Sequence, residues 1–486
     1  MVRRCVRIAV TAGALLGVLS GAGCTAQSAT SQTATSQSVV ASAASAASGS
    51  GGQQLWVARY SDGGGTAVAV GPAGNAVFVT GSATIRFDAA TGARRWVSRY
   101  KGPATISSGF RAVTVSPDGS RVFVTGETWN ALNLPEYVTI AYDASTGSQL
   151  WASLHAGQAA SGGLAAAEAW SIVVSPDGKV VYVTGQSGHA SAGGRIKRGV
   201  YDYVTIAYDA ATGKALWTSH FDNGGNDQGR AIAISPSGDV VYVTGRSFAK
   251  NTGYDYATIA YNAATGRKLW VARYNGRASM NEFAYAITVA PDGKRVYITG
   301  VSYGRTSRTD FATVSYSAAT GRQLWVGRYN GTGNLNDAGT ALAVSPDNAT
   351  VVVTGWSTGT GGKYDIEWAT IAYDARTGAP RWTKRYGVIG QGAPDQNIPA
   401  GVVMNPRGGT VYVTGAVALF SEEGFYGTMS YSLSTGARKW ATSYSGSGPS
   451  SEATALAISP DGRTLYVTGS SDTPNTVDTA TIAYRT

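Results

Sequence analysis

Cysteine and histidine are scarce, with two and three residues in a chain of 486. Cys5 and Cys24 both lie at the N-terminus, so residues 54–486 can form no disulfide, thiol nucleophile or thiolate metal site. The three histidines are His155, His189 and His220. A catalytic mechanism that needs a pair of histidines is therefore disfavoured. We predict no catalytic residue and no metal site.

Charged residues are also few, at 14% of the chain, and no run of basic residues exceeds two. The formal net charge is +10, but Arg3, Arg4 and Arg7 belong to the N-terminal segment. Without those three, 36 basic and 29 acidic residues remain, scattered along the sequence. This distribution is typical of a solvated, mildly cationic surface, so we expect no nucleic-acid partner.

A long hydrophobic run is missing, and the only sustained apolar stretch lies within residues 1–24. Three arginines, a short apolar core and small residues predict a signal peptide there, too short for a comfortable membrane span. The ending Gly-Ala-Gly-Cys resembles a bacterial lipobox and predicts lipidation at Cys24, although Gly21 stands where Leu is usual. Ordinary cleavage nearby, with Cys24 incidental, is the alternative. Both predict export, to the cell surface or as a secreted protein.

Residues 25–53 contain almost only Ser, Ala, Thr, Gln and Gly. Such a segment buries too little apolar surface to offset the entropy of ordering. We expect a flexible tether that links the membrane, through the lipid anchor, to the domain at residues 54–486.

A repeat of about 55 residues is the strongest signal in the sequence. Each copy contains Val-Thr-Gly or a close variant and divides into four short strands rich in Val, Ile, Thr and Tyr, joined by Asp, Gly and Pro turns. The glycines that end this motif are Gly81, Gly126, Gly185, Gly245, Gly300, Gly355, Gly415 and Gly469. Eight four-stranded antiparallel sheets predict an all-β, eight-bladed β-propeller.

The two ends of residues 54–486 complete each other. The last copy stops after its third strand, at Ala-Thr-Ile-Ala-Tyr-Arg-Thr, and the first begins with an isolated fourth strand, Leu55 to Tyr60. Pairing these strands would complete the eighth blade and remove the sheet edge that an open array exposes. We predict that the ring closes in this way.

A tryptophan recurs in the fourth strand of each copy. Ala207 to Trp217 fits A-x-D-x-x-T-G-x-x-x-W, which resembles the tryptophan-docking motif of the pyrroloquinoline-quinone (PQQ) dehydrogenase propellers. The whole repeat is also similar to bacterial SBBP propeller repeats. We expect these tryptophans to pack between blades and to bond a carbonyl through the indole N–H. They are Trp56, Trp96, Trp151, Trp217, Trp270, Trp325, Trp382 and Trp440.

The two faces of the predicted disc differ in their sequence. One face, called the turn face, is formed by short Ser-Pro-Asp-Gly and Asp-Ala-Ala-Thr-Gly turns. The opposite face, called the loop face, is formed by connections of variable length. Binding is expected on the loop face. Asp227, Glu282 and Asp337 enter the innermost strand on the loop face and are candidate ligand-binding residues. Alternatively, each carboxylate binds backbone N–H groups or a hydroxyl such as Ser247 or Ser302 within its own blade.

Aromatic residues outside the docking set also fall near the loop face. Trp129 and Trp356 are candidates for stacking on a sugar or an aromatic ligand. Two charged loops are expected to be solvated: one contains His189, Arg195, Lys197 and Arg198, and the other Glu422 and Glu423. None of these spacings is a known metal or triad signature.

We therefore predict a non-enzymatic binding or assembly scaffold with a protein or glycan ligand on the loop face. The resemblance implies an alternative, a quinoprotein dehydrogenase with PQQ, calcium and an Asp base. This sequence has no Cys-Cys pair for the vicinal disulfide common in those enzymes, and no position matches their base or calcium ligands. A polysaccharide-active propeller is a further alternative. Fold resemblance alone does not decide among them.

Overall fold

The computed structural model describes residues 51–61, 63–103, 108–158, 164–188, 201–362, 365–387, 396–418 and 424–486. The predicted lipidation site Cys24, most of the tether and the two charged loops lie outside these residues. Every regular element in the described part is a β-strand, and no helix there is long and apolar enough to cross a membrane.

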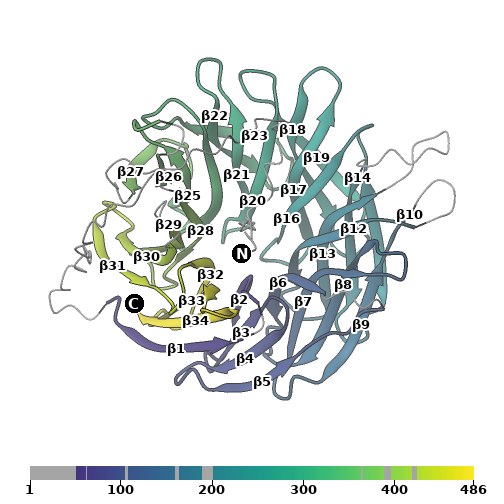
Figure 1. Cartoon of the computed structure of the whole chain (residues 1–486). Coiled ribbons are helices and arrows are strands. Elements are labelled where there is room, and N and C mark those ends of the chain that lie inside the picture. The colour runs from purple at the N-terminus through teal and green to yellow at the C-terminus, as the bar shows by residue number, and fades with distance from the viewer. Residues whose placement is uncertain are drawn as a thin grey trace, which may run out of the picture.

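The strands form eight antiparallel blades arranged around a central axis (Figure 1). The innermost strands contact those of neighbouring blades and surround the axis. These innermost strands are β2 (Ala67–Val70), β6 (Gly109–Val115), β12 (Ala167–Val174), β16 (Asp227–Ile234), β20 (Glu282–Val289), β24 (Asp337–Val344), β28 (Gln396–Met404) and β32 (Ser451–Ile458). The eight-bladed propeller is confirmed.

Two further strands follow the innermost one in each blade. The second strands are β3 (Ala76–Thr80), β7 (Arg121–Trp129), β13 (Val180–Gly188), β17 (Val240–Ala249), β21 (Arg295–Tyr303), β25 (Thr350–Thr358), β29 (Thr410–Ala418) and β33 (Thr464–Asp472). The third strands are β4 (Thr84–Asp88), β8 (Pro135–Asp143), β14 (Tyr201–Asp209), β18 (Gly253–Asn262), β22 (Thr309–Ser317), β26 (Ile366–Asp374), β30 (Gly424–Ser432) and β34 (Val477–Arg485).

The outermost strands complete the blades. They are β5 (Arg94–Ser98), β9 (Gln149–His155), β15 (Ala215–Phe221), β19 (Lys268–Tyr274), β23 (Gln323–Tyr329), β27 (Pro380–Tyr386), β31 (Arg438–Tyr444) and, in the eighth blade, β1 (Gln54–Tyr60). A short hairpin of β10 (Gly157–Gln158) and β11 (Leu164–Ala165) is added between the second and third blades.

Strand β1 pairs antiparallel with β34, from Gln54 opposite Tyr484 to Tyr60 opposite Thr479. The N-terminal strand thus becomes the outer strand of the C-terminal blade, and Figure 1 shows the two chain regions side by side. The predicted closure of the ring is confirmed. Each described blade thus has its fourth strand, and β34 is not left as an open sheet edge.

The Val-Thr-Gly glycine allows a β-bulge in the innermost strand. In the fourth blade, Gly245 pairs with Gly229, and the register then shifts before Ala231. A Cβ at Gly245 would lie 1.9 Å from the carbonyl oxygen of Gln228, which no other residue type could accommodate. The same close approach recurs at Gly126, where the Cβ would lie 2.0 Å from the Gly109 oxygen. The last residue of the motif must therefore be glycine, because the backbone of the innermost strand lies too close for a side chain.

The docking tryptophans connect each blade to the next one on the turn-face side. Trp217 donates from Nε1 to the carbonyl oxygen of Ala263, at 2.9 Å. Its ring packs on Gly266, whose φ of +69° and whose Cβ position 2.6 Å from the ring both require glycine. In the described part of the chain, seven of the eight docking tryptophans make this bond, and the ring of Trp440 packs on Gly52. The apolar cores therefore span adjacent blades, as in the cluster that joins Tyr182 and Tyr261.

Candidate functional site

Asp227, Glu282 and Asp337 are all fully buried, with 0% of their surface exposed. Asp227 accepts hydrogen bonds from the backbone N–H groups of Asn223 and Phe248, at 2.8 and 3.0 Å. The carboxylate therefore joins the connection before β16 to the end of β17 within one blade. Burial raises the pKa of Asp227 above its ordinary value, and the hydrogen bonds from Ser247 and the two N–H groups partly offset this.

The other two carboxylates have comparable surroundings. Asp337 accepts from the backbone N–H groups of Gly331 and Thr358, at 2.6 and 3.1 Å, and Glu282 accepts from the Ser302 hydroxyl at 3.3 Å. Burial raises the pKa of Glu282 to about 7. All three residues thus hold the loops of their own blades, and ligand binding by them stays a prediction.

A second set of carboxylates forms a repeated ion-pair brace on the loop face. In the fifth blade, Arg328 of β23 donates to Asp310 at 2.7 Å, to the Ser302 hydroxyl at 2.7 Å and to the Tyr274 hydroxyl of the preceding blade at 2.9 Å. The brace therefore ties three strands of one blade to its neighbour. A forked guanidinium suits this role because it offers five donors in fixed directions.

The pairing of arginine with a carboxylate recurs in three further blades, and in two of them the arginine also donates to a tyrosine of the preceding blade. Its arginines and carboxylates are Arg59 with Asp478, Arg273 with Asp255, and Arg385 with Glu367. The sequence predicted acidic residues on the loop face but not the arginines that pair with them. The signal was present, because in each case the arginine directly precedes the last tyrosine of the fourth strand.

The third blade departs from this pattern, because His220 occupies the arginine position. Where this blade meets the fourth, Asp202, Asp222 and Asp227 bring carboxylate oxygens within 4.8 Å of one another. Burial, and then the charges of Asp222 and Asp227, raise the pKa of Asp202 to about 7. Oxygen donors of this kind fit a hard cation such as calcium.

Cationic and aromatic side chains stack near the central axis. The guanidinium carbons of Arg111 and Arg230 each lie 3.9 Å from the ring centroid of Trp170. These residues come from β6, β16 and β12, three neighbouring innermost strands. Each occupies the bulge position opposite the Val-Thr-Gly motif. Such contacts contribute about 0.5–2 kcal/mol each, more when desolvated.

The charges around this stack are only partly balanced. Arg111 lies 3.1 Å from Glu127 and 3.6 Å from Glu168. Within the described residues, Arg230 and Arg246 make no ion pair, and Arg246 instead lies over the rings of Tyr254 and Phe283. Burial and the nearby Arg246 and Arg111 lower the pKa of Arg230 to about 10.

The stack was not predicted from the sequence. The predicted aromatic candidates lie elsewhere. Trp129 is a half-buried residue at the end of β7, and Trp356 is half-buried in β25, opposite Ala338 of the innermost strand. The structure does not bring the two together, since they belong to the second and sixth blades.

Four-stranded blades, docking tryptophans and ring closure define the class of protein: a PQQ-like β-propeller. The family model described as outer membrane protein assembly factor BamB matches residues 36–200 and 185–307, together more than half of the chain. The chain belongs to this family. No curated protein matches it.

Solved structures agree on the fold. A quinohemoprotein alcohol dehydrogenase from Pseudomonas putida has a TM-score of 0.55 and 14% identity, over 89% of this chain and 76% of that one. BamB from Moraxella catarrhalis has a TM-score of 0.50 and 14% identity, over 89% and 99%. The Dos1 propeller has a TM-score of 0.56 and 12% identity, over 89% and 94%. At these identities the similarity shows the fold alone.

Proposed function

We propose that this chain is an exported propeller that binds a protein partner on its loop face and acts as a non-enzymatic assembly scaffold. The observation that carries the proposal is the repeated Arg–carboxylate brace, which holds the strands next to the variable loops in four blades. Described residues at the loop tips, such as Lys250, Arg305 and Asn475, are exposed. A fixed rim with variable tips is suited to recognition, because little loop entropy is lost on binding.

Exposed apolar side chains on the loop face support a protein partner. Leu132, between β7 and β8, is 66% exposed, and Met280, before β20, is 49% exposed. The family to which the chain belongs is described as an outer membrane protein assembly factor, which is compatible with export and with protein binding. A glycan ligand and a lipid anchor at Cys24 stay predictions, and mass spectrometry of the mature N-terminus tests the anchor.

Photo-crosslinking in the source cells tests the scaffold. A photoreactive amino acid at Leu132 or Met280 is expected to give one discrete protein adduct. Matched positions on the turn face, Ala90 and Ser145, are also exposed and are expected to give none. Equal labelling from both faces, or no adduct from the loop face, would contradict the proposal.

The quinoprotein alternative rests on the similarity in fold and on the oxygen donors of Asp202, Asp222 and Asp227. PQQ, when bound, would supply the redox chemistry, and the three carboxylates would hold its calcium. A quinone does not fit on Trp170, because the guanidinium groups of Arg111 and Arg230 already contact that ring, each at 3.9 Å from its centroid. Incubation with PQQ and calcium, followed by dye-linked alcohol oxidation, is expected to give no turnover.

A further inference from the structure

A pocket of about 490 Å³ opens on the loop face of the fifth blade. It lies between the connection that precedes β20, the loop from β21 to β22, and the end of β23. Its lining residues are Arg277, Gly304, Arg305, Thr306, Ser307, Asp310, Arg328 and Asn330. The volume falls within the range of small-molecule sites, about 300–1,000 Å³.

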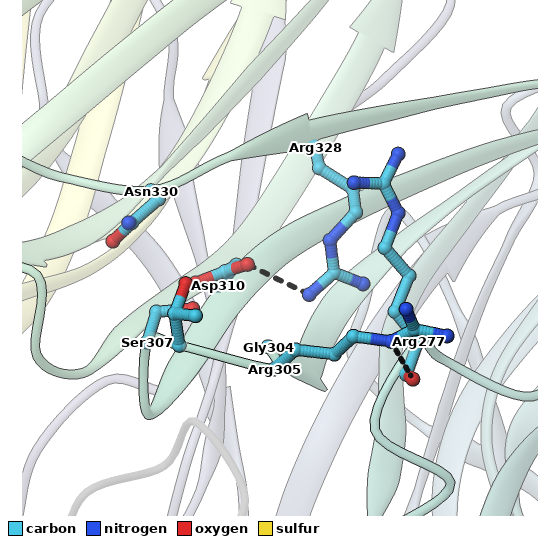
Figure 2. Close-up of a pocket in the computed structure, with 8 residues that line it drawn as sticks. Arg277, Gly304, Arg305, Ser307, Asp310, Arg328 and Asn330 are labelled. Carbon is cyan, nitrogen blue, oxygen red and sulfur yellow. Dashed lines mark hydrogen bonds and ion pairs between the residues drawn. The ribbon is translucent and has the colours of Figure 1, made fainter.

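Three guanidinium groups gather on one side of this pocket, and Ser307 and Asn330 lie on the other (Figure 2). Arg328 is held in place by the brace described above, and only 13% of its side chain is exposed. Arg305 donates from Nε to the carbonyl oxygen of Arg277, at 3.1 Å. That bond orients Arg305 while its two terminal nitrogens remain available to a ligand.

The positive charge in the pocket exceeds what the protein neutralises. Asp310 is the one acidic lining residue, and it is already paired with Arg328. Among the described residues, neither Arg277 nor Arg305 makes an ion pair, and both side chains are exposed. The lining therefore carries three positive charges and one negative charge.

We infer that this pocket binds a phosphate monoester on a small molecule or at the end of a polymer. A phosphate monoester carries about 1.5–2 negative charges at pH 7, which matches the excess of the lining. Its three terminal oxygens can accept from several guanidinium forks, whereas a planar carboxylate is saturated by one. Ser307 lines the side of the pocket opposite the guanidinium groups, and its hydroxyl suits the polar body of a sugar. Asn330 lines the same side, with its amide nitrogen donating to Asn334 at 2.7 Å.

The sixth blade provides an internal comparison. Asn330-Gly331-Thr332 there corresponds to Asn275-Gly276-Arg277, and Gly359-Thr360 corresponds to Gly304-Arg305. Its brace is intact without either arginine, because Arg385 still pairs with Glu367. The two extra arginines of the fifth blade are therefore not needed to build a blade, and replacing them with threonine keeps a sequence that the fold already uses.

Calorimetric titration with glucose 1-phosphate, inorganic phosphate and glucuronate tests the inference on residues 51–486 and on the full chain. Wild type is expected to bind glucose 1-phosphate most strongly. The variant R277T/R305T is expected to lose roughly tenfold or more in affinity, since each charge-assisted contact contributes on the order of tenfold. Raising the salt concentration should weaken wild-type binding, because the contacts are exposed.

The matched control removes the same charge from the turn face, where Arg267 and Arg376 are exposed. R267T/R376T should bind as wild type does, and R305K should retain part of the affinity. Equal melting temperatures of all variants exclude unfolding as the cause. Absence of saturable phosphate binding by wild type, unchanged binding by R277T/R305T, or a preference for glucuronate would each overturn the inference. None of these outcomes depends on the proposed protein partner.

Discussion

On the turn face, hydrogen bonds lower the pKa of Asp88, Asp118 and Asp143 to about 2, whereas on the loop face burial raises the pKa of Asp202 and Glu282 to about 7. The turn acids are close to solvent and accept from the N–H and hydroxyl groups of their own turns. The loop acids are buried away from water, and the hydrogen-bond donors around them replace only part of the lost hydration.

This contrast shows how one repeat serves two purposes. The turn face needs the same compact turn in each blade, so a local bond between an aspartate and its own turn suffices. The loop face must hold connections of different lengths, so its acids bind groups distant in sequence, such as Arg328 with Asp310. Hydrogen bonds within a turn follow from the turn motif alone, whereas bonds between residues distant in sequence differ from blade to blade.

Deleting residues 54–60 should have the largest effect, since it breaks the eighth blade on both faces. The change removes the docking of Trp56 and the brace of Arg59, and it exposes the edge of β34. We expect a loss in the free energy of unfolding greater than the ~3–5 kcal/mol of a large core truncation. Chemical denaturation measures it, and unchanged stability would disprove the closure.

The next largest difference is expected between tryptophans of the two faces, in the stability lost when each is replaced by alanine. Trp217→Ala removes the bond to Ala263 and the packing on Gly266, and we expect a loss of about 3–5 kcal/mol in the free energy of unfolding. Trp356→Ala, near the loop face, should cost under roughly 2 kcal/mol, because the ring is only partly buried. Denaturant titration of both variants compares them, and equal losses would contradict the division of roles.

Ion pairs of the two faces should show a smaller difference. Arg273→Met leaves Asp255 buried without its cation, at a cost of about 1.5–3 kcal/mol. Arg95→Met breaks the pair with Asp88 on the turn face, where the arginine side chain is 54% exposed, and should cost under about 1 kcal/mol. Stability in low and high salt separates them, since salt should reduce only the second effect.

The smallest effect is a pH dependence of opposite sign on the two faces. The raised pKa of Glu282, about 7, means that stability falls as pH rises from about 4.5 to 7, because the folded state holds the proton longer. The lowered pKa of Asp143, about 2, means that its contribution is present above pH ~4 and is lost as pH falls towards 2. Glu282→Gln should flatten the first slope, and Asp143→Asn the second, in denaturation curves at pH 2.5, 5 and 8. Slopes unchanged by either variant would contradict the assignment.

Two of the missed features, the tryptophan stack and the arginine pocket, have a common physical cause. The stack of Arg111, Trp170 and Arg230 joins bulge positions about 60 residues apart in sequence, and the bulge itself is set by a glycine on another strand. Arg277 and Arg305 come from separate loops and meet only in the folded protein. Periodicity does not report contacts of this kind, because they occur once and not in each repeat.

The sequence by itself determined the architecture: eight copies of one motif, each with its own turns, and two ends that complete one blade. That was possible because each blade must bury the same faces against its neighbours, which forces the pattern to recur. Only the tertiary structure decided what the polar residues do. Asp227 is enclosed by its own blade, whereas Arg277 borders an open pocket, because burial and partners depend on loops whose paths no repeat dictates.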